Sequence, residues 1–227
     1  MDRHHVNAQA ASEPGGKGTS DPFDHGPHSI THGFVSDTMI ATLSGEKPVQ
    51  HLLPGDRVLT RDSGYQPLLA TELVKPPPGS PGASLNEVEF GFASLGHGVP
   101  QRSLTVAAGH RFLLCGPSVL HHSGEYEALA TARHIAESYQ IVRRQSPRAR
   151  AYHHLLLGRH EIVQANGCWC ESQNIYAPDT PSSGRNPWNG APTPIQSSRF
   201  QPARLCLSLH QTLMILHHEV GHAVRVA

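Results

Sequence analysis

Many short strand-like runs, separated by turns, dominate the chain from residue 33 onward. They fall at residues 66–74, 86–93, 102–107, 111–115, 125–130, 139–143, 152–157 and 161–164. Turn-forming residues separate them, such as Pro76–Gly79 and Gly116-Pro117. Strands do not alternate with long helical segments, so a parallel sheet is not expected. Close spacing of short strands predicts an all-β sandwich or barrel-like fold.

Two segments are predicted to be helical. A short helix is expected near residues 128–136. A second is expected near the C-terminus, because Leu209, Leu213, Leu216 and Val220 are spaced as one face of a helix. We expect this C-terminal helix to pack on the β core.

Composition divides the chain into four parts. Residues 1–32 are polar and lack periodicity, which indicates a flexible leader. Residues 33–172 hold the β pattern. Residues 173–202 are rich in Pro, Ser, Asn and Gly and indicate a linker. Residues 203–227 form the predicted helical tail.

Charge and hydropathy limit the classes of partner. The chain has 18 Lys and Arg against 18 Asp and Glu, so its net charge is zero with histidine neutral. This balance does not predict binding to nucleic acid or to a membrane surface. The sequence shows neither the apolar core of a signal peptide nor a run of about 18 apolar residues. A protein partner remains open.

Three separated segments point to one known family. They are GFVSDTMIATLSGEKPVQHLLPGDRVLTRDSGYQPL at 33–68, LTVAAGHRFLL at 104–114 and YHHLLLGRHEIVQANG at 152–167. Their order and separation resemble those of the Hint (hedgehog/intein) domains, especially the bacterial ones. The resemblance implies a Hint-type fold and protein autoprocessing, in which the first residue, Cys or Ser, attacks the carbonyl that precedes it.

The chain departs from that family at three positions. The residue at the nucleophile position is Gly33, and the hydroxyl residue expected three positions before His110 is Ala107. Glu171-Ser172 stands where inteins have the His-Asn pair whose Asn cyclises. The resemblance therefore implies a degenerate Hint domain that has lost autoproteolysis and needs no cofactor.

Two histidines remain candidate site residues, His110 and His160. In the family, the histidine equivalent to His110 lies beside the scissile amide and helps to protonate its nitrogen. A second interpretation is that His110 is only a buried, hydrogen-bonded core residue. The late block retains His160, close to the predicted Asn166-Gly167 turn, for which type I′ geometry is favoured.

An active Hint domain with an unconventional nucleophile is the main alternative. Ser36 and Thr38 carry the nearest hydroxyls after Gly33. The family's acyl shift passes through a five-membered ring that only residue 33 can form with the carbonyl before it. Ser36 and Thr38 lie downstream, so each would need a separate approach and a general base. Turn or strand roles explain both residues more simply.

A zinc metallopeptidase is the second alternative. His218-Glu219-Val220-Gly221-His222 matches the H-E-x-x-H pattern, which on a helix aligns two imidazoles for zinc. No third ligand follows His222, so adventitious metal binding by His217, His218 and His222 is the simpler interpretation. Cys168-Trp169-Cys170 is interpreted as a strand around a packed Trp, with metal binding or a disulfide as alternatives. Cys115 and Cys206 are predicted to lie in the core, and no functional metal is expected.

Overall fold

The computed structural model describes residues 32–75, 87–139, 150–173, 202–217 and 225–226. Strands dominate, which confirms the all-β fold with a C-terminal helix. The strands are β1 (Met39–Thr42), β2 (Gly45–Pro48), β3 (Arg57–Thr60), β4 (Gly64–Pro67), β5 (Ala70–Val74), β6 (Glu87–Phe90), β7 (Leu104–Ala107), β8 (Arg111–Cys115), β9 (Glu127–Thr131), β10 (Tyr152–Leu156), β11 (Ile162–Ala165), β12 (Cys168–Glu171), β13 (Leu205–Cys206) and β14 (Arg225–Val226). The helices are η1 (Val49–His51), α1 (Pro117–Ser123), α2 (Ala132–Ser138) and α3 (Leu209–His217).

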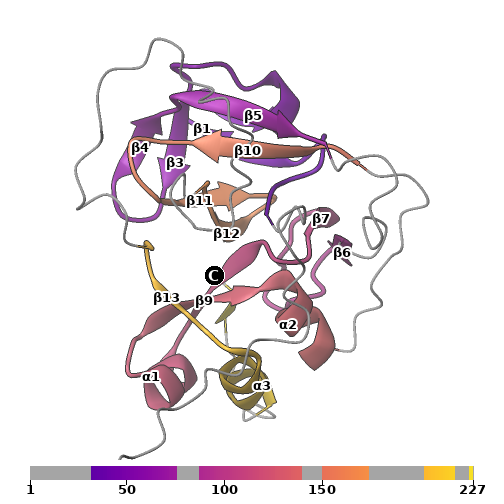
Figure 1. The fold of residues 1–227 in the computed structure, drawn as a ribbon, viewed down its shortest axis with the longest axis vertical. Helices are drawn as coiled ribbons and strands as arrows, with labels where there is room; N and C mark the ends of the chain where they lie inside the picture. The colour runs from indigo at the N-terminus through magenta and orange to yellow at the C-terminus, as the bar shows by residue number, and fades with distance from the viewer. Residues whose placement is uncertain (1–31, 76–86, 140–149, 174–201, 218–224, 227) are drawn as a thin grey trace, which may run out of the picture.

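The strands pair in an order that interleaves distant parts of the sequence. Within the described residues, a 10-stranded sheet follows the path β13-β9-β8-β12-β11-β1-β3-β4, with β14 beside β8 and β2 beside β1 (Figure 1). Two further antiparallel pairs, β5 with β10 and β6 with β7, complete the strands. The late strands β11 and β12 lie between the early strand β1 and the middle strand β8. The three segments singled out in the sequence therefore meet in space.

The β11–β12 hairpin has the tight turn that the sequence predicted. Asn166 and Gly167 both have positive φ angles, of 47° and 83°, as a type I′ turn requires. The Asn166 side chain also accepts a hydrogen bond from Met39 N (2.8 Å) and donates one to Ser103 O (2.9 Å). The amide therefore ties this turn to the start of β1.

The middle helices differ from the sequence prediction. The helix expected at 128–136 begins at Ala132, because residues 127–131 form β9 and pair with β8. Thr131 caps α2, its side chain accepting a hydrogen bond from His134 N. Helix α1 was predicted only as a turn at Gly116-Pro117. Pro117 occupies its first turn, where a missing N–H costs nothing.

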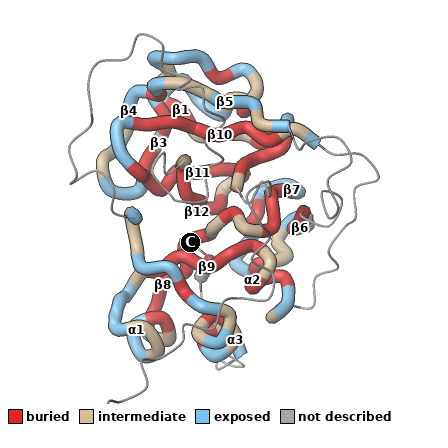
Figure 2. Tube along the Cα trace, in the orientation of Figure 1, coloured by how far each residue is buried: buried red, intermediate tan, exposed pale blue. Residues whose placement is uncertain are grey.

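The core lies along the centre of the molecule, where the strands are coloured as buried in Figure 2. Phe34, Phe90 and Phe112 are fully buried, and the rings of Phe90 and Phe112 meet edge to face with centroids 5.1 Å apart. Each such ring contributes about 1.5–3 kcal/mol through burial. Within the described residues, no helix has both the length and the apolar character needed to cross a membrane.

The C-terminal segment packs on the β core, but not through the predicted face. Strand β13 pairs with β9 in parallel, and α3 packs on α1 and α2. The fully buried residues of α3 are Thr212 and Ile215, whereas Leu209, Leu213 and Leu216 are only partly buried. The helix is confirmed, and its buried face is rotated because two helices flank it. Cys206 was predicted to be in the core and is exposed on β13.

Candidate functional site

The first peptide bond of the described chain joins His32 to Gly33, and we call it the junction. Just after it, Phe34 and His153 exchange backbone hydrogen bonds, with Phe34 N to His153 O at 3.0 Å and His153 N to Phe34 O at 2.7 Å. Ala107 N donates to Gly33 O at 3.2 Å. The end of β7 and the start of β10 thus fix the backbone on the C-terminal side of the junction.

Two histidines hold the junction peptide bond at its two ends. Gly33 N donates a hydrogen bond to His110 Nδ1 at 3.2 Å. On the other side, His154 Nε2 lies 3.0 Å from the carbonyl oxygen of His32. A carbonyl oxygen only accepts, so His154 Nε2 carries the hydrogen of this bond. One imidazole thus lies beside the amide nitrogen, and the other polarises the carbonyl.

Both junction histidines are neutral at neutral pH. Burial lowers the pKa of His110 to about 3, and burial lowers the pKa of His154 to about 4. The His110 ring lies against Phe34, with centroids 4.4 Å apart, and its Nε2 atom has no hydrogen-bond partner among the described residues. The interpretation of His110 as a core residue is therefore incomplete, because this ring also contacts the junction amide.

Gly33 lacks both a side chain and the room for one. Its φ angle is +119°, a conformation that L side chains rarely adopt. A Cβ atom added there would lie 2.8 Å from His154 Cδ2 and 2.8 Å from Tyr152 Cβ. The His154 ring therefore occupies the space into which a side chain on residue 33 would project.

Ala107, the second departure from the family, is fully buried beside the junction. Its N–H contacts Gly33 O, and its carbonyl accepts His110 N at 2.9 Å. The backbone at position 107 thus supports the junction, but the methyl side chain cannot donate a hydrogen bond. Polarisation of the junction carbonyl by a side chain comes from His154 instead.

Glu171 is the centre of a buried charge cluster close to the junction. Its carboxylate accepts hydrogen bonds from Arg111 N and Arg111 Nη1, both at 3.0 Å, and lies 2.8 Å from His32 Nδ1. Burial by itself raises the pKa of Glu171, but His32, His160 and Arg111 together hold that pKa well below its usual range. Glu171 is thus held as an ionised carboxylate.

His160 lies near a different oxygen of the Glu171 carboxylate from the one that His32 contacts. Its Nε2 atom is 3.5 Å from Glu171 Oε2, and its Nδ1 atom accepts a hydrogen bond from Ala203 N at 3.0 Å. The structure therefore brings His110 and His160 to the same region, but to different partners. His110 contacts the junction amide, whereas His160 joins Glu171 to the C-terminal segment.

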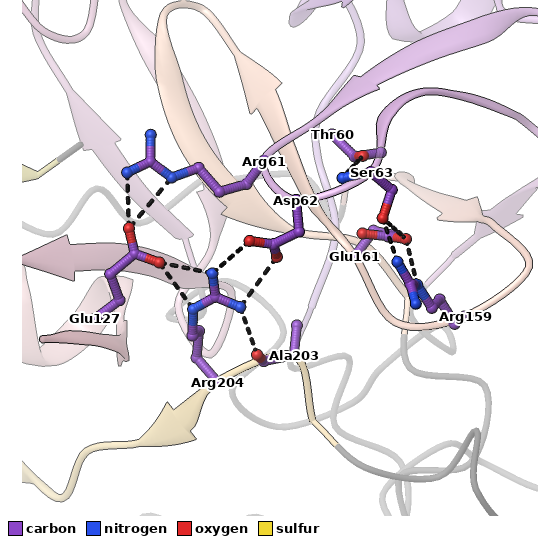
Figure 3. A network of polar contacts seen from close by, with 9 residues as sticks. All are labelled: Thr60, Arg61, Asp62, Ser63, Glu127, Arg159, Glu161, Ala203 and Arg204. Carbon is purple, nitrogen blue, oxygen red and sulfur yellow. Dashed lines mark hydrogen bonds and ion pairs between the residues drawn. The ribbon is translucent and has the colours of Figure 1, made fainter. Parts of the chain in front are cut away.

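An ion-pair network, which we call the Arg204 clamp, holds that C-terminal segment in place (Figure 3). The Arg204 guanidinium contacts Asp62 at 2.6 and 3.0 Å and Glu127 at 2.6 and 2.8 Å. Arg61 also donates to Glu127 at 2.7 Å. Because Ala203 precedes Arg204, the clamp fixes the backbone N–H that bonds to His160.

Sequence reasoning missed His32, His154 and the role of Glu171. His32 was assigned to the leader, and Glu171 was noted only as part of the Glu171-Ser172 pair that stands where inteins have His-Asn. The His153-His154 pair in a strand offered a usable signal, because successive strand residues point to opposite faces. His153 bonds to Ser36, whereas His154 bonds to the junction.

The other candidate residues have separate environments. Ser36 Oγ bonds to His153 Nε2 at 3.1 Å, and Thr38 Oγ1 donates to Val35 O at 2.8 Å. Cys168 and Cys170 are buried free thiols. Burial raises the pKa of Cys168 to about 12, which makes it a poor nucleophile. The His218–His222 motif lies outside the described residues.

Comparison with protein families gives a match to the Hint domain over residues 32–176. Solved structures similar to this chain include the gp41-1 intein, with 13% identity, coverage of 63% of this chain and 98% of that chain, and a TM-score of 0.37. The bacterial intein-like domain from Clostridium thermocellum has 13% identity, coverage of 64% and 100%, and a TM-score of 0.34. The MchDnaB-1 intein has 13% identity, coverage of 63% and 99%, and a TM-score of 0.36.

No curated protein matches the chain. The family match covers well over half of the residues and includes the junction, His110, His154, His160 and Glu171. This chain therefore belongs to the Hint domain family.

Proposed function

We propose that this protein is a degenerate Hint domain, which holds its junction peptide bond in the manner of an autoprocessing site but does not cleave it. On this proposal, the domain persists as a scaffold or interaction module. His110 and His160 are then remnants of the site rather than working catalytic groups.

The observation that carries the proposal is the environment of Gly33. The acyl shift of the family needs a side-chain sulfur or oxygen on the residue that follows the scissile carbonyl. Position 33 has no such atom, and His154 and Tyr152 lie within 2.8 Å of where its Cβ would be. The junction is thus supported at its nitrogen and its oxygen but has no attacking group on residue 33.

The nearest hydroxyls do not favour an unconventional nucleophile. Thr38 is buried, and its hydroxyl donates to a carbonyl three residues earlier in the turn. Ser36 is paired with His153, whose pKa is lowered by burial, so this pair has a neutral base. A Ser-His pair can activate a hydroxyl, and Ser36 is therefore the residue to remove if cleavage is found.

The test uses the full chain with a carrier protein fused before Met1. The purified fusion is incubated with hydroxylamine or dithiothreitol and examined on a gel and by mass spectrometry. We expect no release of a fragment ending at His32, either in the wild type or in a His110→Ala control. Release in the wild type that is lost in His110→Ala overturns the proposal, and a Ser36→Ala variant then identifies the nucleophile.

A further inference from the structure

Three metal-ligating side chains converge next to the junction. They are His32 at the start of the described chain, His110 just before β8, and Glu171 at the end of β12. One ligand atom from each lies within 4.8 Å of the other two. The closest pair is His32 Nδ1 and Glu171 Oε1, at 2.8 Å. Residues far apart in the sequence thus form one compact donor set.

A second observation indicates that this donor set is incomplete as it stands. His110 is 2% exposed, and its Nε2 atom is buried without a hydrogen-bond partner among the described residues. Buried polar atoms are nearly always paired, and an unpaired one calls for a ligand, a water molecule or an ion. The His32 side chain is 18% exposed, so solvent reaches the edge of the cluster.

We propose that His32, His110 and Glu171 bind a divalent transition-metal ion of the zinc class. Two imidazoles and one carboxylate form a donor set typical of zinc with a fourth position open to water. The imidazoles disfavour magnesium and calcium, which prefer all-oxygen sites. The sequence predicted no metal here, because His32 fell in the predicted leader and Glu171 was not assigned a role.

The geometry requires a rearrangement of the ligand atoms, in which the 2.8 Å His32–Glu171 pair opens and any pair as far apart as 4.8 Å closes. Tetrahedral zinc has bonds of about 2.0–2.1 Å, which places its ligand atoms about 3.3 Å apart. His32 is half-buried at the end of the described segment, and rotation of its side chain is the simplest way to close the cluster. The Arg111 guanidinium, which donates to Glu171, opposes the charge of the ion and weakens its binding.

Metal binding and the junction contact compete for His110. Gly33 N–H donates to Nδ1, so in the neutral ring the hydrogen lies on Nε2. An ion on Nε2 moves that hydrogen to Nδ1, where it faces the Gly33 N–H. An ion on Nδ1 replaces the Gly33 contact directly. Whichever nitrogen binds, the Gly33–His110 hydrogen bond is lost when the ion is held.

The test measures zinc binding by calorimetry and cobalt binding by visible absorption, with each metal alone. The full chain carries His217→Ala, His218→Ala and His222→Ala throughout, which removes the tail imidazoles as a rival site. We expect one ion per chain. We expect His32→Ala to weaken binding by at least about tenfold, the scale seen for disrupted zinc shells. His121→Ala, on the outside of α1, is the matched control and leaves binding unchanged.

A second measurement follows the Gly33 amide by hydrogen exchange. Zinc is expected to accelerate exchange at this amide in the parent chain and to have no effect in His32→Ala. The proposal is overturned if the tail-substituted chain binds no ion, or if His32→Ala binds zinc as tightly as the parent. These readouts do not depend on cleavage, so they stand apart from the proposed loss of autoprocessing.

Discussion

The junction, at the start of the Hint domain, and the Arg204 clamp, on the C-terminal segment that follows it, are held by opposite means. At the junction, neutral buried imidazoles contact backbone atoms, and a glycine is the only residue that fits. At the clamp, partly exposed charged side chains form several ion pairs around one guanidinium. The junction therefore depends on exact packing, whereas the clamp depends on charges that solvent screens.

The largest expected effect is at Gly33. Gly33→Ala should destabilise the protein by about 2–4 kcal/mol, because it combines strain at a positive φ angle with overpacking against Tyr152 and His154. Urea unfolding followed by circular dichroism measures this change. Gly55→Ala is the matched control, since Gly55 also has a positive φ angle but open space around its Cβ position. Equal losses in the two variants would show that His154 does not fill the space at residue 33.

A cysteine alone should not restore cleavage. Gly33→Cys supplies a thiol, but its Cβ meets Tyr152 Cβ at 2.8 Å, and that atom cannot swing aside. In the carrier-fusion assay, we expect Gly33→Cys to release no carrier in hydroxylamine, and Gly33→Cys combined with Ala107→Ser to do no better. Efficient cleavage by the single variant would mean that the junction is more adaptable than the packing around Gly33 indicates.

The clamp should matter less than the junction. Arg204→Ala removes contacts to Asp62 and Glu127 and should destabilise the protein by about 1 kcal/mol, at the upper end for exposed ion pairs. Arg102→Ala, which breaks an exposed pair with Glu46, is the control and should change stability by much less. Urea unfolding measures both, and a loss from Arg204→Ala comparable to that from Gly33→Ala would reverse the comparison.

As pH falls, acid should weaken the junction first and the Arg204 clamp second. Burial depresses the pKa of His110 and of His154 in the folded state, so protonation favours unfolding. Their contribution is complete above an unfolded pKa of about 6.5 and is lost as pH falls toward 4. The pKa of Asp62 is also lowered, by its hydrogen bonds with Arg204. Burial raises the pKa of Glu127, but Arg61 and Arg204 together lower it below its ordinary value. Because carboxyls start from a pKa of about 4, the clamp weakens only below that pH.

Unfolding free energy measured against pH, with a chelator present, tests this order. The wild type should lose stability first between pH 6.5 and 4 and again below pH 4. His154→Gln should reduce the loss of unfolding free energy between pH 6.5 and 4, and Arg204→Ala should reduce the loss below pH 4. If the loss of stability between pH 6.5 and 4 is unchanged in His154→Gln, protonation of His154 does not cause it.

The smallest expected effect is the reaction of a single cysteine with a thiol reagent. Cys206 is exposed on β13, beside the clamp, whereas Cys115, Cys168 and Cys170 are buried. A thiol reagent should therefore modify one cysteine in the native protein and four after unfolding, and Cys206→Ser should abolish the native reaction. Neighbouring groups partly desolvate the Cys206 thiol and raise its pKa, so this reaction should be slow at neutral pH. Modification of further thiols in the native protein would show that β8, which holds Cys115, or β12, which holds Cys168 and Cys170, opens.

The all-β fold could be predicted from the sequence because turns and strand periodicity are local properties. The Asn166-Gly167 turn is an example, since its conformation follows from two adjacent residues. The buried face of α3 differs from the predicted face because the helices that flank α3 are distant in sequence. Helix α1 was not predicted because its Gly-Pro start also indicates a turn. Cys206 was misplaced because an apolar neighbourhood does not show which strand lies at an exposed edge.

The candidate site was only partly predictable for the same reason. His110 and His160 carried recognisable spacing, and the absence of a nucleophile at Gly33 was plain. The contacts of His154 with His32 O and of Glu171 with Arg111 arise from β10, β12 and β8 meeting in space. No local sequence pattern predicts contacts between residues on such distant strands. Tyr152 and His154 crowding Gly33 likewise required the tertiary structure.

Intact mass spectrometry of the untagged full chain tests the central claim most directly. The protein is kept at neutral pH for several days, with and without hydroxylamine, and its mass is followed. We expect no fragment that ends at His32 or begins at Gly33, because the His32–Gly33 bond is held by His110 and His154 but not attacked; deamidation or hydroxylamine cleavage at Asn166-Gly167 and Asn189-Gly190 gives other masses. Paired fragments corresponding to residues 1–32 and 33–227 would contradict this expectation.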